Sequence, residues 1–270
     1  MKILFPALLM MGIFTALITY FLQYYYQISF KSTTAVHSLL GIVLGLILVF
    51  RMNSAYDRWW EGRKLWGALV NNTRTLAIKL NAFLPKDSES RIFFKDMIPN
   101  FAFALKEHLR EGVRIEELQS KDENFSTTIQ LKTHKPNYIS SLMYEKITDH
   151  FHKGDFTGEQ VLVLDKEFKE FTDIMGACER IKNTPIPYSF SMFIKKFIFT
   201  YIITLPFAFM SDFDFWTVPI VLFLFFILLS IELISEEIED PFGQDTNDLP
   251  TDAMSEKIQM NVKEIFNLKD

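Results

Sequence analysis

Charge-free apolar segments lie near both ends of this chain, and most of its charged residues lie between them. A helix needs about 20 predominantly apolar residues to cross a bilayer. Four segments meet this requirement: residues 4–25, 38–58, 188–210 and 215–234. Residues 59–187 are rich in charge and predict a domain outside the membrane. The pattern therefore predicts an integral membrane protein with four transmembrane helices.

The second apolar segment continues into charged sequence without a proline. Residues 38–50 carry no charge, whereas residues 51–66 carry six charged side chains. As one helix, the 29 residues from 38 to 66 would reach roughly 43 Å at about 1.5 Å per residue. The pattern predicts a helix that begins in lipid and ends in water.

Two apolar stripes run along the charge-free half of this helix. Residues four positions apart drift by only about 40° around a helix, so each set of three shares a face. One stripe is Ile42, Leu46 and Phe50, and the other is Leu40, Leu44 and Leu48. Periodicity alone leaves open which stripe faces lipid, a neighbouring helix or a pore.

The region outside the membrane has the apolar spacing of helices, with large apolar residues recurring every three or four positions. The first predicted helix ends at Pro85, and three more cover residues 92–109, 139–152 and 159–182. No alternating run suggests a sheet, so the fold class is all-α. Two prolines flank Ile186 in the sequence TPIP, and they prevent a regular helix and hold the backbone extended.

Charge also predicts the topology. The link after the first span holds only Lys31, the loop at residues 211–214 holds no lysine or arginine, and the region after the second span is rich in both. Cytoplasmic loops carry the excess of basic residues. Both termini and residues 59–187 are therefore predicted to lie in the cytoplasm, which makes the chain a multi-pass protein of a cell membrane.

An acidic segment follows the fourth span, and residues 235–270 are predicted to form an acidic turn and a C-terminal tail. Carboxylates at a helix C-terminus are disfavoured by the macrodipole, so a positive group should compensate them. A lysine or arginine of another segment could do so, or a cation, because oxygen ligands on a turn suit calcium. The segment does not match the EF-hand pattern. Its acidic residues are Glu236, Glu237, Glu239, Asp240, Asp245 and Asp248.

Composition gives no support for an enzyme or a nucleic-acid partner. Net charge is −5 and the isoelectric point is about 5.6, which does not suit nucleic acid. The single cysteine, Cys178, excludes an intrachain disulfide. Catalytic patterns such as GxSxG, HExxH and CxxC are absent. His150 and His152 would point in different directions on a helix, which argues against a metal site.

Three blocks of sequence resemble the bestrophin family in its bacterial branch. They are FRMNSAYDRWWEGRKLWG at residues 50–67, TPIPYSF at 184–190 and IEDPFGQDTNDLP at 238–250, and the resemblance covers about residues 4–253. It implies a homopentamer around a central pore, in which each subunit, residues 1–270, has four transmembrane helices and a cytosolic helical domain. It also implies a channel for small monovalent ions, either chloride-type anions or, as in some bacterial members, sodium-type cations. The alternative is a non-conducting membrane scaffold whose cytosolic domain binds a partner.

The same resemblance implies roles for particular residues. Ile42, Leu46 and Phe50 fall on the family's hydrophobic neck, where rings of apolar side chains gate by dewetting. Ile186 falls on the second constriction, at the cytosolic aperture. Asp240, Asp245 and Asp248 fall on a calcium-binding turn of animal members, but Thr246 and Asn247 interrupt the acidic run here. We therefore expect this turn to be structural, with calcium as the less favoured reading, and expect no other cofactor. The implied partners are further copies of the chain, membrane lipid and permeant ions.

Overall fold

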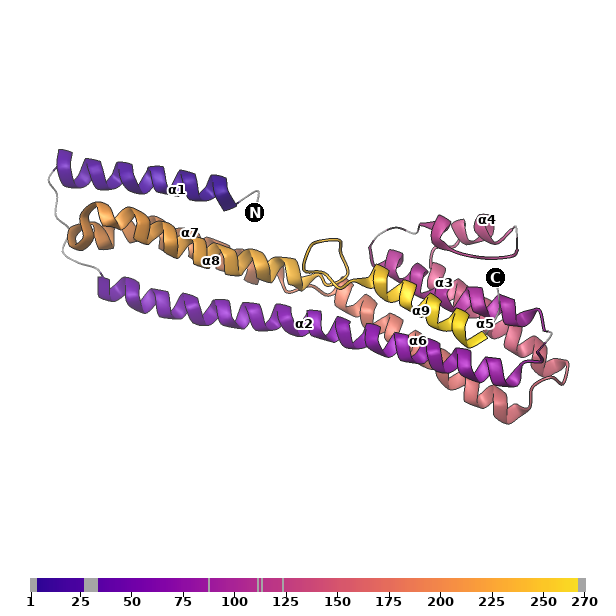
Figure 1. The fold of residues 1–270 in the computed structure, drawn as a ribbon. Coiled ribbons are helices and arrows are strands. Elements are labelled where there is room, and N and C mark those ends of the chain that lie inside the picture. The colour runs from indigo at the N-terminus through magenta and orange to yellow at the C-terminus, as the bar shows by residue number, and fades with distance from the viewer. Residues whose placement is uncertain are drawn as a thin grey trace. The chain divides into compact units, whose positions relative to one another are not determined.

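Helices provide all the regular structure in the part of the chain that the computed structural model describes (Figure 1). The described residues are 4–26, 34–86, 88–110, 112, 114–122 and 124–266. The chain divides into two units. The first comprises Met1–Arg58 and Pro185–Glu239, and the second comprises Trp59–Thr184 and Asp240–Asp270. The predicted all-α fold class is confirmed.

Within the described residues, three helical segments are long and apolar enough to cross a membrane. They are Leu4–Tyr25, Thr34–Phe83 and Tyr188–Glu239. The first consists of α1 (Leu4–Thr19) and a π-helical turn (Tyr20–Tyr25). The second is α2 (Thr34–Phe83), one continuous helix of 50 residues that contributes to both units.

The third segment reverses direction in its middle. It consists of α7 (Tyr188–Phe213), a 3-10 turn (Asp214–Trp216) and α8 (Thr217–Glu239), and α7 packs beside α8 (Figure 1). Asp214 has a φ of 51°, in the left-handed region that few residues other than glycine adopt. The sequence analysis expected a loop over residues 211–214. That boundary was wrong, because the helix continues to Phe213 and the reversal begins at Asp214.

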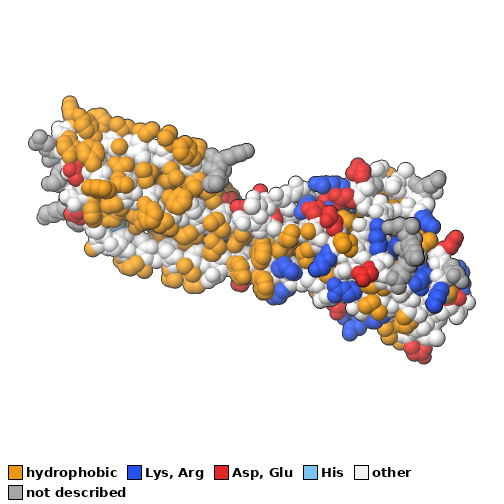
Figure 2. All heavy atoms as spheres, viewed as in Figure 1, with side chains coloured by type: hydrophobic (Ala, Val, Ile, Leu, Met, Phe, Trp, Pro, Cys, Tyr) orange, Lys and Arg blue, Asp and Glu red, His pale blue; other side chains and the backbone are white. Residues whose placement is uncertain are grey.

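The first unit is held together by apolar side chains of all four of its helices. Its buried core contains Met11, Leu44, Leu48, Ile194, Ile198, Ile202, Leu205, Val221 and Phe225. Its outer surface is also apolar, as the side chains on its visible face in Figure 2 show. A surface of this kind suits contact with lipid rather than water.

The second unit combines the later part of α2 with helices of its own. These are α3 (Ser90–Leu109), a 3-10 turn (Ile115–Glu117), α4 (Phe125–Gln130), α5 (Lys135–His152), α6 (Gly158–Asn183) and α9 (Thr251–Phe266). Lysine, arginine and acidic side chains are scattered over its surface, as expected for a unit in water (Figure 2). α3 lies at its centre and packs against α5, α6 and α9.

Two helices of the second unit were not predicted. α4 is short, and the sequence analysis assigned residues 235–270 to a turn and a tail, where the structure has α9. The signal for α9 was present, because Ile258, Val262 and Phe266 recur at four-residue spacing and are buried against the core. The other predicted helices lie within α2, α3, α5 and α6.

Candidate functional site

The two apolar stripes of α2 lie in different environments. Leu44 and Leu48 are 0% and 2% exposed, in the core of the first unit. Ile42, Leu46 and Phe50 are 70%, 56% and 59% exposed. Periodicity left open which stripe faces lipid, a neighbouring helix or a pore. Leu44 and Leu48 pack against helices of their own chain. The Ile42 stripe is available for lipid, another subunit or a pore.

The TPIP sequence separates α6 from α7, as the two prolines predict. α6 ends at Asn183 and α7 begins at Tyr188, with non-helical backbone between them. The backbone N–H of Ile186 donates a hydrogen bond to Oε1 of Glu239 at 2.6 Å. The side chain of Ile186 is half-buried. Its backbone is thus attached to the last residue of α8.

The acidic end of α8 is compensated by basic residues of other segments, as expected. Nη2 of Arg51 lies 2.6 Å from Oε2 of Glu239, and its Nε lies 3.8 Å from Glu232. Nζ of Lys195 lies 2.8 Å from the carboxylate of Glu236. A buried carboxylate requires such a partner, because the charged form loses its hydration. Of the two alternatives, the structure provides arginine and lysine partners.

Arg51 was not among the candidate site residues, although it follows Phe50 directly. It is 1% exposed, and an arginine this deeply buried is rare unless it is paired. The signal in the sequence was its place as the first charge after a long apolar run. Its partners could not be inferred, because Glu232 and Glu239 lie far away along the chain.

The acidic turn that follows α8 belongs to the second unit and is organised by hydrogen bonds. Oδ2 of Asp248 accepts the backbone N–H of Asp245 at 2.6 Å. Nε of Arg110 donates to the carbonyl oxygens of Phe242 and Gly243 at 3.2 and 3.1 Å. These bonds give the turn a structural explanation without a metal.

The three aspartates of the turn do not gather as a ligand set. Asp240 and Asp245 are exposed, and Asp248 is half-buried. Within the described residues, two groups of three ligand atoms lie within 4.8 Å of one another, and neither includes this turn. Calcium binding by Asp240, Asp245 and Asp248 stays a prediction. The three carboxylates, as they are arranged in this structure, do not form a set of ligands for the ion.

The first of these two groups is Glu107, Glu117 and Asp252. Nζ of Lys106 lies among these carboxylates, and Nη1 of Arg110 lies 2.7 Å from Asp252. Burial of Asp252 would raise its pKa, but its hydrogen bonds to Lys106 and Arg110 hold that pKa below its usual value. Because the basic residues already neutralise it, the group is an ion-pair network that joins α3 to α9.

The second group is His108, His134 and Glu179. Nε2 of His108 lies 2.9 Å from Oε1 of Glu179, and Nε2 of His134 lies 2.7 Å from the same oxygen. Nδ1 of His134 accepts the backbone N–H of Asn137 at the start of α5. This bond leaves the proton of neutral His134 on Nε2, from which it is donated to Glu179. The group is therefore satisfied by hydrogen bonds.

The remaining candidates for chemistry have structural explanations. Burial raises the pKa of Cys178 to about 12, so its thiol stays protonated at neutral pH. Buried His150 is hydrogen-bonded to Asp155 and Ser90, whereas His152 is exposed. The two histidines therefore differ in environment, as their spacing predicted.

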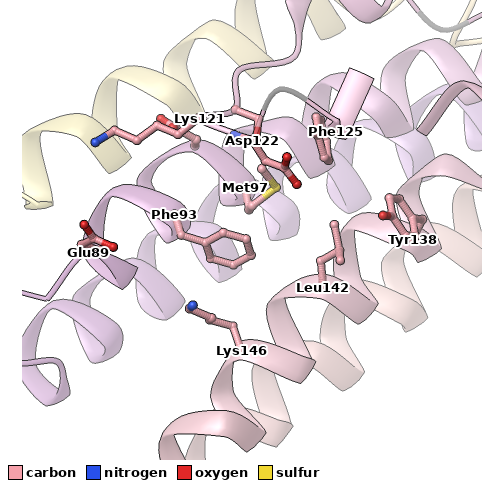
Figure 3. Close-up of a pocket in the computed structure, with 11 residues that line it drawn as sticks. Glu89, Phe93, Met97, Lys121, Asp122, Phe125, Tyr138, Leu142 and Lys146 are labelled. Carbon is pink, nitrogen blue, oxygen red and sulfur yellow. The ribbon is translucent and has the colours of Figure 1, made fainter. Parts of the chain in front are cut away.

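A pocket of about 320 Å³ lies in the second unit between α3, α4, α5 and the loop before α4 (Figure 3). Apolar Phe93, Met97 and Leu142 line it together with charged Lys146 and Asp122. Such a lining can hold a small molecule that has both polar and apolar parts.

Comparison with known proteins identifies the family. The sequence pattern of the family described as Bacterial/Fungal Bestrophin protein matches residues 1–264. The chain belongs to the bestrophin family. A curated relative, the voltage-dependent anion channel-forming protein alr2987 of Nostoc sp., is 35% identical over 84% of this chain and 76% of its own length. The voltage-dependent anion channel-forming protein YneE of Escherichia coli K12 is 30% identical over 94% of this chain and 84% of its own.

Solved bestrophin structures have the same fold. A bacterial bestrophin homologue from Klebsiella pneumoniae superimposes with a TM-score of 0.90 at 28% identity, covering 97% of this chain and 98% of its own. A similarity of this extent includes both units of the chain. The membership that the three sequence blocks suggested is confirmed.

Proposed function

We propose that this chain is one subunit of a homopentameric bestrophin channel that passes small monovalent ions through a hydrophobic neck. The observation that carries the proposal is the contrast between the two stripes of α2. Ile42, Leu46 and Phe50 are exposed on the isolated chain although they are apolar, whereas Leu44 and Leu48 of the neighbouring stripe are buried and only Leu40, near the start of the helix, is exposed. Five copies of this stripe around an axis would form three apolar rings one turn apart, which can gate by dewetting.

The proposal includes four transmembrane helices in each subunit, formed by α1, the first part of α2, α7 and α8. The reversal at Asp214 supports counting the segment Tyr188–Glu239 as two spans, because 52 residues of helix far exceed the bilayer thickness. The basic residues after the second span support a bacterial inner-membrane protein with both termini in the cytoplasm. Ile186 forms the narrow point of the cytosolic aperture.

The sign of the permeant ion is the open choice within this proposal. The names of the relatives from Nostoc and Escherichia coli favour small anions such as chloride. The net charge of −5 favours cations such as sodium, although an apolar neck contributes no sign of its own. We propose a chloride-type anion first. Reversal potentials of the purified protein in a planar bilayer with a NaCl gradient test this choice.

Two measurements test the channel itself. Wild-type protein should give single-channel currents in planar bilayers, and Ile186→Ala should raise their conductance because the aperture widens. A protein without currents, both as wild type and with alanine at residues 42, 46 and 50, would support the non-conducting scaffold instead. Calcium binding by the acidic turn is tested separately by the thermal shift of the full chain with calcium, and Asp245→Asn should abolish that shift.

A further inference from the structure

The segment Pro185–Ile186–Pro187 has a single backbone hydrogen-bond donor. Proline lacks an N–H, so Ile186 provides the one donor of the three residues. That donor bonds Oε1 of Glu239 at 2.6 Å. A hydrogen bond to a carboxylate is shorter and stronger than one between neutral groups. The single N–H of the backbone that carries the proposed aperture residue is therefore bound by one side chain.

The second oxygen of the same carboxylate is held by the residue that follows the proposed neck. Nη2 of Arg51 lies 2.6 Å from Oε2 of Glu239. Arg51 is 1% exposed and the side chain of Glu239 is 13% exposed, so water screens their attraction only weakly. Glu232 is farther from Arg51, at 3.8 Å, which is too long for a hydrogen bond.

The main chain of Glu239 is also attached to α2. Nε of Arg58 donates to its carbonyl oxygen at 3.0 Å, two helical turns beyond Arg51. Glu239 is the last residue of α8, where carbonyl oxygens have no partner within the helix. One residue thus joins α2, α8 and the segment before α7, and all of these contacts lie within the first unit.

We propose that Glu239 is a positioning residue that couples the neck to the aperture. An ion pair and a hydrogen bond in series, from Arg51 to Glu239 and from Glu239 to the N–H of Ile186, connect the helix turn that carries Phe50 to the backbone of Ile186. A movement of α2 at the neck is thereby passed to the aperture. This inference rests on the proposed channel function, because it takes its two constrictions from that proposal.

A double-mutant cycle in planar bilayers tests the coupling with the full chain. The conductance ratio of Ile186→Ala to its parent is measured in the wild-type and the Glu239→Ala backgrounds. Without the carboxylate, the Ile186 side chain no longer occupies a fixed place, so its removal matters less. We expect the ratio to fall by at least about twofold, the smallest coupling usual for residues in contact.

Two further backgrounds separate coupling from charge and from folding. Glu236→Ala removes the same charge from the same acidic segment but breaks an exposed pair with Lys195, so it should leave the ratio unchanged. Glu239→Gln keeps an oxygen that can accept the N–H of Ile186 but loses the second oxygen that pairs with Arg51, so its ratio should lie between those of wild type and Glu239→Ala. Equal ratios in wild type and Glu239→Ala, with wild-type currents present, would overturn the coupling alone. A wild type without currents would overturn the channel proposal and the coupling with it.

Hydrogen exchange provides a readout that needs no current. In a peptide that begins at Thr184, this residue carries the N-terminal amine, and Pro185 and Pro187 have no N–H. Between residues 184 and 187, the peptide therefore reports the exchange of the Ile186 N–H alone. Arg51→Met should speed the exchange of this amide although Arg51 does not touch Ile186, because Glu239 then loses its second anchor. Glu236→Ala should leave the exchange rate unchanged. An unchanged rate in Arg51→Met would contradict the coupling even if that variant conducts.

Discussion

Leu44 and Leu46 form a matched pair that tests the assignment of the two stripes. They are the same residue type, two positions apart on α2, and their exposed fractions are 0% and 56%. We expect Leu44→Ala to destabilise the protein with little effect on conductance. Leu46→Ala should do the reverse, because it widens a proposed ring of the pore without opening a cavity in the core.

The size of the stability effect follows from what leucine loses in each place. Leu→Ala removes three carbons, worth about 2.4 kcal/mol at about 0.8 kcal/mol per methylene in water. Lipid chains are as apolar as leucine, so most of this part disappears when the unfolded helices stay in the membrane. Soluble cores lose roughly 2.7–5.0 kcal/mol on the same change. The cavity part that remains for Leu44→Ala is therefore up to about 2.6 kcal/mol, against less than about 0.5 kcal/mol for exposed Leu46.

The assay compares both variants in one detergent. Thermal unfolding is followed by tryptophan fluorescence and by loss of the oligomer on size exclusion, and the same preparations are then reconstituted in planar bilayers. The expected result is a lowered melting temperature for Leu44→Ala alone and a raised conductance for Leu46→Ala alone. If Leu46→Ala lost as much stability as Leu44→Ala, or if Leu44→Ala changed the conductance more, the assignment of the stripes would be wrong.

Three further predictions concern stability. Arg51→Met should lower the free energy of unfolding by about 3–5 kcal/mol, because it leaves Glu232, which is 1% exposed, without its positive neighbour. Arg51→Lys should lower it less, and equal melting temperatures of the two variants would refute this prediction. Burial lowers the pKa of His108 in the folded state, so the unfolded chain takes up the proton first as the pH falls. Stability should therefore decline as the pH falls below about 6.5. In thermal unfolding, His108→Gln should weaken that decline. Gly62→Ala should cost about 1–3 kcal/mol, because a Cβ there would lie 3.2 Å from the Phe242 ring, and an unchanged melting temperature would contradict that contact.

The parts of the fold that could be predicted are those that depend on local spacing. Apolar runs and helical periodicity predicted α1, α2, α3, α5, α6, α7 and α8, and two prolines predicted the break around Ile186. The reversal before α8 was placed early because Ser211 and Asp212 favour a loop by composition, whereas the helix continues to Phe213. The last helix was not predicted although its apolar spacing indicates one, because the acidic segment before it favoured a turn and a tail.

The parts that could not be predicted depend on contacts between distant segments. Periodicity cannot rank the Leu44 stripe against the Leu46 stripe, because burial is decided by where α7 and α8 lie. The acidic end of α8 did predict a positive partner, since helix-terminal carboxylates need one. That this partner is Arg51 requires a contact across 188 residues, which no local pattern contains.

The buried charges around Arg51 are better explained by position than by stability. Replacing a buried ion pair or triad with apolar side chains of similar volume is often neutral or stabilising, by about 1–4 kcal/mol. The combined change Arg51→Met, Glu232→Gln and Glu239→Leu should therefore recover most of the stability that Arg51→Met alone loses. It cannot restore the bond to the N–H of Ile186, because leucine accepts none. A variant that is stable but exchanges the Ile186 amide rapidly would separate the two roles, whereas recovery of slow exchange would show that packing alone places the aperture.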